Sequence, residues 1–325
     1  MVFLRFFNGV NIMNEREVMN KLKYLIKKKR CLENIELELG LKDYEVFALI
    51  EKIEQEGYTI NYENDRFFIQ HVLRKKEQSI DLEGAEIKSI LYVSDTHIGS
   101  KFARIDLLDR AYRIAYEQGI DTVLHTGDIS NGIYYGRKDF EKETEVIGWF
   151  DSLDCVVNKY PCYANMTTYF IGGNHDATYR AEFRKDIGEA ISQQRKDLIY
   201  LGDDSAELTL GRTKIRLFHG SRKLGCDRNS KMRVYYDSFP PSKEPDILLM
   251  GHYHHSGFMR YKNGYCVQCA ALLDETPYAN RMGYINEKGV WILNLTTDEY
   301  GDIIQLEPEL LDFTESKPKV LKRKK

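Results

Sequence analysis

Short apolar runs separated by polar segments make up residues 89 to about 308 of this 325-residue chain. Short runs rich in branched and aromatic side chains are typical of buried strands. Longer segments with helical periodicity lie between the first of these runs, at 104–117, 141–158 and 181–195. This alternation predicts an α/β domain. The runs that we interpret as strands leading to polar blocks are 90–93, 122–124, 169–171, 215–218 and 247–250.

After residue 206 the helical segments give way to closely spaced short runs, which predict a second, mixed sheet. Two sheets packed face to face, with helices on the outside, would account for both parts of the pattern. The runs assigned to the second sheet are 206–210, 213–218, 257–261, 265–270, 290–295 and 302–307.

Residues 14–71 have the pattern of a separate small domain. Three helical segments are followed by a hairpin signal, an order typical of a winged-helix domain, which is a helix-turn-helix variant. The third segment, 43–56, is acidic and would be repelled by phosphates. A protein partner or self-association through this winged-helix-like module is therefore favoured. The basic run 27–30 leaves DNA contact open.

The remaining segments are polar or short. Residues 1–13 form an N-terminal extension, 72–88 a charged linker, and 309–325 a basic tail that we expect to be disordered. The net charge is −3, and six cysteines in a chain of this size do not indicate a disulfide framework. No apolar run approaches the roughly 20 residues of a membrane span. We therefore expect a cytoplasmic protein without membrane contact.

Polar side chains of the types that bind metals follow the predicted strands. Because α/β folds place their sites at the carboxyl ends of strands, these side chains are expected to gather at one edge of a sheet. The blocks, in chain order, are Asp95-Thr96-His97, Gly127-Asp128, Gly173-Asn174-His175-Asp176, His219-Gly220 and Gly251-His252-Tyr253-His254.

The mixture of carboxylate, amide and imidazole donors suits divalent ions such as Mn²⁺, Fe²⁺ or Zn²⁺, and we expect Mn²⁺. The candidate ligands outnumber what one ion needs, which favours two ions that hold a bridging hydroxide and clamp a phosphoryl group. His175 remains without a metal and can protonate the leaving oxygen, while Asp176 can orient His175 or its loop. The candidate ligands are Asp95, His97, Asp128, Asn174, His219, His252 and His254.

The ordered set of blocks resembles the signature of the calcineurin-like metallophosphoesterases over roughly residues 89–275. The resemblance implies a four-layer αββα sandwich with a binuclear metal centre. It also implies that Asp128 bridges the two ions and that His175 is the catalytic histidine. The other ligands would divide into Asp95, His97 and His254 for one ion and Asn174, His219 and His252 for the other.

Within that family, the segment 94–100 is similar to that of two DNA-directed branches, the double-strand-break-repair exonucleases and the small subunit of archaeal family-D DNA polymerase. The segment 127–135, and 173–177 with Arg180, resemble the polymerase branch more. The similarity implies a phosphodiesterase acting as a nuclease on DNA ends or single strands. The chain departs from these branches, because it shows no oligonucleotide-binding barrel and lacks the repair nucleases' extra histidine after the Gly-Asp block. A small phosphodiester or a phosphoprotein as the substrate, or a non-catalytic regulatory subunit of a DNA-processing complex, stays open.

Basic residues and tyrosines lie close to the polar blocks. Cations that hold phosphates, beside rings that stack bases, are what a single-stranded nucleic-acid groove needs, so nucleic acid is the expected substrate. His125, in contrast, is interpreted as a packed strand histidine, and Cys266 and Cys269 as small core residues. The candidate substrate-binding residues are Tyr134, Tyr135, Arg180, Arg222, Lys223 and Arg228.

Overall fold

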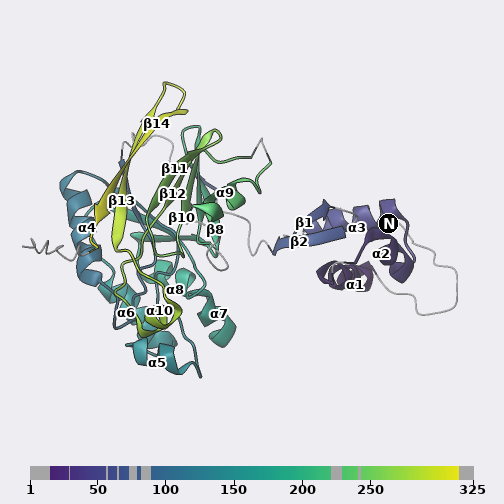
Figure 1. Ribbon diagram of the computed structural model, residues 1–325, viewed down its shortest axis with the longest axis horizontal. Coiled ribbons are helices and arrows are strands. Elements are labelled where there is room, and N and C mark those ends of the chain that lie inside the picture. The colour runs from purple at the N-terminus through teal and green to yellow at the C-terminus, as the bar shows by residue number, and fades with distance from the viewer. Residues whose placement is uncertain are drawn as a thin grey trace, which may run out of the picture. The chain divides into compact units, whose positions relative to one another are not determined.

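The computed structural model describes residues 15–28, 30–55, 58–63, 66–72, 79–81, 89–220, 229–240 and 243–314. The chain divides into two compact units, Met1–Lys76 and Glu77–Lys325 (Figure 1). Both the predicted extension 1–13 and the tail beyond residue 314 lie outside the described residues.

The N-terminal unit contains three helices and a two-stranded antiparallel sheet. Leu22, Ile35 and Ile53, one from each helix, are fully buried in a common apolar core. This is the order of elements that the sequence predicted, whereas the assignment to the winged-helix class and the interaction role stay predictions. The elements are α1 (Glu15–Lys27), α2 (Leu32–Leu39), α3 (Asp43–Gln55), β1 (Tyr58–Glu63) and β2 (Arg66–Val72).

The larger unit is built on two six-stranded sheets. The first has the order β14-β13-β4-β5-β6-β7, in which β4 to β7 are parallel and β13 and β14 add antiparallel strands beside β4. Its strands are β4 (Ser89–Val93), β5 (Thr122–His125), β6 (Thr167–Ile171), β7 (Leu198–Gly202), β13 (Gly289–Thr297) and β14 (Ile303–Asp312).

The second sheet has the order β11-β12-β10-β9-β8-β3 and mixes parallel with antiparallel pairs. Because β9 and β10 are parallel, their carboxyl ends lie at the same edge. Its strands are β3 (Ser79–Asp81), β8 (Ser205–Leu210), β9 (Thr213–Phe218), β10 (Ile247–Met250), β11 (Gly257–Tyr261) and β12 (Gly264–Gln268).

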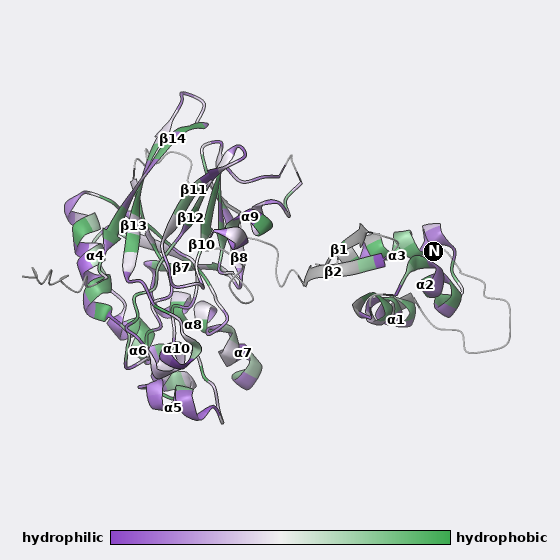
Figure 2. Ribbon diagram, in the orientation of Figure 1, coloured by the Kyte–Doolittle hydropathy of each residue, from purple (hydrophilic) through white to green (hydrophobic). Residues whose placement is uncertain are grey.

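The alternation of side chains along β4 explains how the layers are held together. Ile90 and Tyr92 belong to the core between the two sheets, whereas Leu91 and Val93 belong to the core under the helices. The result is the four-layer αββα sandwich that the resemblance implied, with α4 outside the first sheet and α9 outside the second (Figure 1). Figure 2 shows the central strands as largely hydrophobic and α5 as mostly hydrophilic.

Two of the predicted helices each prove to be a pair. The segment 141–158 breaks before Gly148, whose φ is 113°, and 181–195 breaks at Arg184, which is left-handed at φ 56°. Both breaks fall where the backbone leaves the helical region, a change that helical periodicity alone does not predict. The helices are α4 (Ile105–Glu117), α5 (Lys138–Glu143), α6 (Trp149–Lys159), α7 (Ala177–Phe183), α8 (Ile187–Gln194), α9 (Ser230–Tyr236) and α10 (Pro277–Met282).

The prediction that 290–295 and 302–307 belong to the second sheet is wrong. They form β13 and β14 of the first sheet, where Trp291 lies opposite Tyr92. The physical reason is that both faces of β13 are apolar. Val290 and Ile292 face the helices, while Trp291 packs between the sheets, so the run would suit either sheet.

Two predicted boundaries also change. Ser79–Asp81 lies inside the predicted linker, yet it forms β3 and pairs with β8. The predicted tail began at residue 309, but β14 continues to Asp312 because Leu311 packs against the core under the helices. In the part of the chain that is described, no helix has both the length and the apolar character needed to cross a bilayer.

Candidate metal centre

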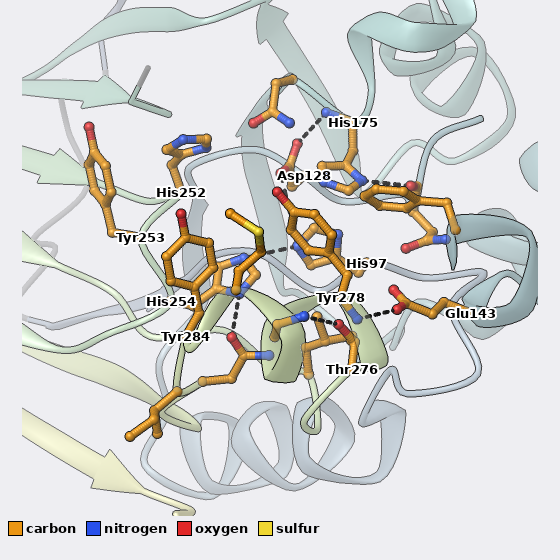
Figure 3. Close-up of a pocket in the computed structure, with 18 of the residues that line it drawn as sticks. His97, Asp128, Glu143, His175, His252, Tyr253, His254, Thr276, Tyr278 and Tyr284 are labelled. Atoms are coloured by element: carbon orange, nitrogen blue, oxygen red, sulfur yellow. Dashed lines mark hydrogen bonds and ion pairs between the residues drawn. The ribbon is translucent and has the colours of Figure 1, made fainter. Parts of the chain in front are cut away.

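The five polar blocks meet at the carboxyl ends of strands from both sheets. Asp95, Asp128 and Asn174 follow β4, β5 and β6 of the first sheet, whereas His219 and His252 follow β9 and β10 of the second. The side chains therefore face one another across the edge where the two sheets meet. Figure 3 shows His97, His175, His252 and His254 arranged around Asp128.

The first group of donors contains Asp95, His97 and His254, whose ligand atoms all lie within 4.8 Å of one another. His97 Nε2 is 3.2 Å from His254 Nε2, and His254 Nε2 is 3.3 Å from Asp95 Oδ1. Three donors converging from β4 and the loop after β10 can hold one divalent ion.

The second group contains Asp128, His219 and His252. His219 Nε2 lies 3.2 Å from Asp128 Oδ2 and 3.1 Å from Asn174 Oδ1, so the amide oxygen joins this group. Asp128 Oδ2 is also 3.9 Å from His97 Nε2. This carboxylate therefore stands between the two groups, in the position that a bridging ligand requires.

The backbone at these positions is unusual. Asp95, His97, Asp128, His252 and His254 all have φ between 44° and 77°, a left-handed conformation that few residues other than glycine adopt. Such conformations cluster at functional sites, where the surrounding structure holds them. Here they turn the loops sharply after β4, β5 and β10 and aim these side chains back into the site.

Close packing around these loops depends on glycine. A Cβ on Gly251 would lie 2.1 Å from Ser94 Oγ, and one on Gly173 would lie 2.2 Å from Asp128 Oδ1. Neither space admits a carbon atom. The glycines of the Gly-His and Gly-Asn-His-Asp blocks are therefore required by the approach of one ligand loop to another.

Hydrogen bonds to the distal ring nitrogens orient three of the histidines. Nδ1 of His219 lies 2.7 Å from the Thr126 carbonyl oxygen, and Nδ1 of His254 lies 3.0 Å from Asn286 Oδ1. His175 Nδ1 lies 2.7 Å from the carbonyl oxygen of Asn131. Donation from Nδ1 leaves Nε2 free to bind a cation or a substrate. Asn286 belongs to no sequence motif, so it could not be predicted as a partner of His254.

The two oxygens of the Asp95 carboxylate differ in their hydrogen bonds. Asp95 Oδ2 accepts hydrogen bonds from Ser94 Oγ (2.6 Å) and from the backbone N–H of His252 (2.9 Å). Asp95 Oδ1 is buried and has no well-formed hydrogen bond among the described residues. An orphaned buried acceptor is costly unless a cation satisfies it. This oxygen, together with the neighbouring imidazoles, fits a metal ion.

The charge balance also fits cation binding. Burial and the nearby His175 lower the pKa of His97, and burial and His219 lower the pKa of His252 to about 4, so both rings are neutral and able to coordinate. Burial acts against a charge on His219, but Asp128 and Asp95 raise its pKa to about 10. The two carboxylates thus favour positive charge at this position, as cation binding requires.

His175 lies on the open side of the cluster, with 15% of its side chain exposed. Its Nε2 is 3.9 Å from Asp128 Oδ2, and its ring meets that of His97 edge-on at 4.5 Å. Its backbone N–H donates to Asp128 Oδ1 at 2.8 Å. The imidazole is thus fixed beside the candidate metal ligands Asp128 and His97.

Asp176 does not face the site, and its carboxylate instead ties two ligand loops together. It accepts hydrogen bonds from the backbone N–H groups of Gly173, Ile129 and Ser130 and from the Ser130 hydroxyl. Burial and the charge of Asp128 raise the pKa of Asp176 to about 7, whereas the four donors favour its ionised form. Through these hydrogen bonds Asp176 joins the loop that carries Asp128 to the loop that carries Asn174.

A cavity of about 620 Å³ opens beside the cluster. Among the candidate substrate residues, Tyr134 lines this cavity, but Tyr135 is 55% exposed and is absent from its lining. Arg180 is ion-paired with Asp186 and Asp203, so the structure does not support its assignment to substrate. The sequence could not show this pairing, because Asp203 is 23 positions away. Arg222, Lys223 and Arg228 lie outside the described residues.

Three further residue assignments can be compared with the structure. His125 is fully buried, and its ring nitrogens lie 3.1 Å from the Gly127 N–H and 3.2 Å from Thr96 Oγ1, which confirms the packed histidine. Cys266 and Cys269 are fully buried, which confirms them as core residues.

Solved structures that resemble the chain share little sequence with it. An archaeal phosphodiesterase is 16% identical, with 69% of this chain and 99% of that chain covered and a TM-score of 0.40. A predicted phosphoesterase from Streptococcus pneumoniae TIGR4 is 16% identical, with 71% and 94% covered and a TM-score of 0.37. Vps29 from Chaetomium thermophilum is 13% identical, with 71% and 100% covered and a TM-score of 0.38.

No curated protein matches the chain. The model of the calcineurin-like phosphoesterase superfamily domain, however, matches residues 89–269, which is more than half of the chain. The match begins at β4 and ends just after β12, so it contains all five polar blocks. The chain therefore belongs to the calcineurin-like phosphoesterase superfamily and is a metal-binding hydrolase of phosphate esters.

Proposed function

We propose that this chain is a two-metal phosphodiesterase and that its substrate is a nucleic acid, cleaved at a DNA end or within a single strand. The proposal of two metal ions is supported by the position of Asp128 between two groups of donors. One group is Asp95, His97 and His254, and the other is Asn174, His219 and His252.

Two divalent ions at these groups, Mn²⁺ in the first instance and Fe²⁺ or Zn²⁺ as alternatives, would supply Lewis acidity and an activated water. The protein's own contribution is positional. Asp128 sets the spacing of the two groups, and His175, held by the Asn131 carbonyl, presents Nε2 to the leaving oxygen as a proton donor. Asp176 keeps the two loops in register.

The proposal of a nucleic-acid substrate is supported by the aromatic lining of the cavity, which includes Tyr134, Phe140, Tyr253 and Tyr278. Rings beside a phosphate-binding centre suit a strand with stacked bases. A small phosphodiester is the second candidate, because Arg137 is the one Lys or Arg among the described residues that line the cavity.

The decisive experiment compares two substrates across metals. Purified protein loaded with Mn²⁺, Fe²⁺ or Zn²⁺ is assayed on bis-p-nitrophenyl phosphate and on end-labelled single-stranded DNA. We expect turnover of both, abolished in Asp128→Asn and retained in Asp154→Asn, a change to an exposed carboxylate on α6. Turnover of the small ester alone would reject the nuclease. If the Asp128→Asn protein lost hydrolysis but kept the full biological activity of the wild type, the chain would instead be a non-catalytic regulatory subunit.

The basic segment after His219 gives a second test of the nucleic-acid part. Binding becomes less dependent on salt concentration when a cationic side chain that pairs with a phosphate is removed. Arg222→Ala and Arg228→Ala should therefore weaken the binding of single-stranded DNA and flatten its dependence on salt concentration. Unchanged salt slopes would exclude these side chains from the substrate groove.

A further inference from the structure

The side of the cavity next to His175 is a continuous wall of aromatic rings. The rings of Tyr134 and Phe140 lie 4.3 Å apart with an angle of 30°, and Phe140 lies 5.3 Å from Tyr278 with an angle of 37°. Tyr134 and Phe140 also approach the His175 ring, at 5.1 and 5.9 Å. Figure 3 shows Tyr278 pointing from α10 toward the candidate metal ligands.

Core packing does not account for this wall. The three rings are only partly buried, they line the cavity, and none belongs to the buried apolar clusters of the described residues. Tyr134 and Phe140 come from the loop after β5 and from α5, which follow each other in the chain, whereas Tyr278 comes from α10, more than 130 positions later. Partly exposed aromatic surface in a cavity is typical of a binding site.

The wall is also held rigidly. The backbone N–H of Tyr278 donates to Glu143 Oε1 at 2.6 Å, and Arg281 forms an ion pair with Asp139, so α10 is tied to α5 at two points. Thr276 Oγ1 caps α10 by accepting from the Ala279 N–H at 3.1 Å. A preformed surface loses little conformational freedom when it binds a flat group.

The charge near the wall points to a planar group rather than a phosphate. Two guanidinium groups stack on the wall. That of Arg137 lies over the rings of Tyr134 and Phe140, at 5.3 and 5.8 Å from their centres, and that of Arg281, which pairs with Asp139, lies 5.7 Å from the centre of the Tyr278 ring. A guanidinium stacked on rings extends the flat surface.

We propose that this aromatic wall, made of Tyr134, Phe140 and Tyr278, binds the nucleobase of the nucleoside that carries the leaving oxygen. The inference rests on the proposed phosphodiesterase function. In the hydrolysis, a water oxygen bonds to phosphorus and releases a proton to solvent, while the bond from phosphorus to the leaving oxygen breaks. That oxygen takes a proton from His175. Because the wall adjoins His175, the group it binds lies on the leaving side of the phosphate.

The test uses three dinucleotides: thymidylyl-thymidine and its two analogues in which a tetrahydrofuran replaces one of the two bases. Product analysis identifies which nucleoside leaves. Removal of the leaving-side base should lower kcat/KM by about 5- to 100-fold, the effect of losing one stacked base, and removal of the other base should lower it less. Tyr278→Ala should lower kcat/KM by a similar factor on the intact dinucleotide and have little effect on the analogue without the leaving-side base.

Two variants serve as controls. Tyr278→Phe keeps the ring and should retain the preference for a leaving-side base, and Tyr135→Ala removes an exposed ring that is not part of the wall. Equal loss on all three dinucleotides in Tyr278→Ala, or no effect of base removal in the wild type, would overturn the base-binding wall while leaving the phosphodiesterase intact. Failure to cleave any dinucleotide, together with turnover of p-nitrophenyl phosphate, would overturn both proposals.

Discussion

Replacement of Asp176 by Asn tests whether the Asp176 carboxylate holds the loops of the candidate metal centre in place. The carboxylate accepts from four donors, two at each oxygen, whereas an amide offers one oxygen and one NH₂ group. The least costly orientation puts the NH₂ group toward Ser130, whose hydroxyl can rotate and accept. The backbone N–H of Ser130 then has no acceptor. One buried unsatisfied N–H costs about 1–3 kcal/mol of unfolding free energy.

The loss should reach the metals, because the affected loops carry Asp128 and Asn174. Outer hydrogen bonds of this kind typically contribute about 10- to 100-fold to metal affinity. We therefore expect Asp176→Asn to lower the thermal midpoint by roughly 2–10 °C and to weaken Mn²⁺ binding by that factor. Circular dichroism gives the first quantity, and calorimetric titration of the metal-free protein gives the second.

Asp186→Asn is the matched control. Asp186 Oδ1 also accepts two backbone N–H groups, from Gly188 and Glu189, but it does so at the start of α8 and does not line the cavity. This variant should lose comparable stability and keep its metal affinity. Wild-type metal affinity in Asp176→Asn, or equal metal loss in the two variants, would refute the reasoning.

Four further outcomes are expected. His175→Ala should keep its metal content, measured by mass spectrometry, and lose about 10²–10⁴-fold in turnover; a parallel loss of metal would make His175 a ligand. Asn286→Ala should weaken metal binding by about 10- to 100-fold in the same calorimetric titration, because it removes the Nδ1 partner of His254. Gly251→Ala should reduce the unfolding free energy by about 1–3 kcal/mol in urea titration, since the new methyl meets Ser94; an unchanged midpoint would contradict the packing argument. Chelation should lower the melting temperature, and excess Mn²⁺ should restore it, with about 2.7 kcal/mol expected at a hundred times Kd.

Much of the fold and of the candidate site could be predicted, because both follow from strand–loop periodicity. Asp95, Asp128 and Asn174 each come directly after an apolar run, and parallel strands bring such positions to one edge. Strand β13 could not be assigned to its sheet, since apolar residues on both faces satisfy either sheet equally. The pairing of β3 with β8 could not be predicted either, because a three-residue strand has almost no periodic pattern.

Parts of the site that lie outside the polar blocks escaped prediction for a different reason. Tyr278, which lines the cavity, and Asn286, which contacts His254, come from α10 and the segment that follows it, where no spacing or motif marks a functional residue. Arg180 is a cationic residue of the kind that contacts phosphates, but it forms ion pairs with Asp186 and Asp203. Such pairings depend on distant residues meeting in space, which the local sequence does not encode.

The division of the candidate metal ligands between two sheets has a consequence for synthesis of the protein. The ligands that follow the first sheet's strands have all been made once Asn174 is added. His252 and His254 follow almost 80 positions later. A growing chain on the ribosome therefore holds Asp95, His97 and Asp128 without the histidines that complete either donor group. We therefore expect hydrolytic activity only after β10 has paired with β9, and none in a growing chain that has not yet reached His252.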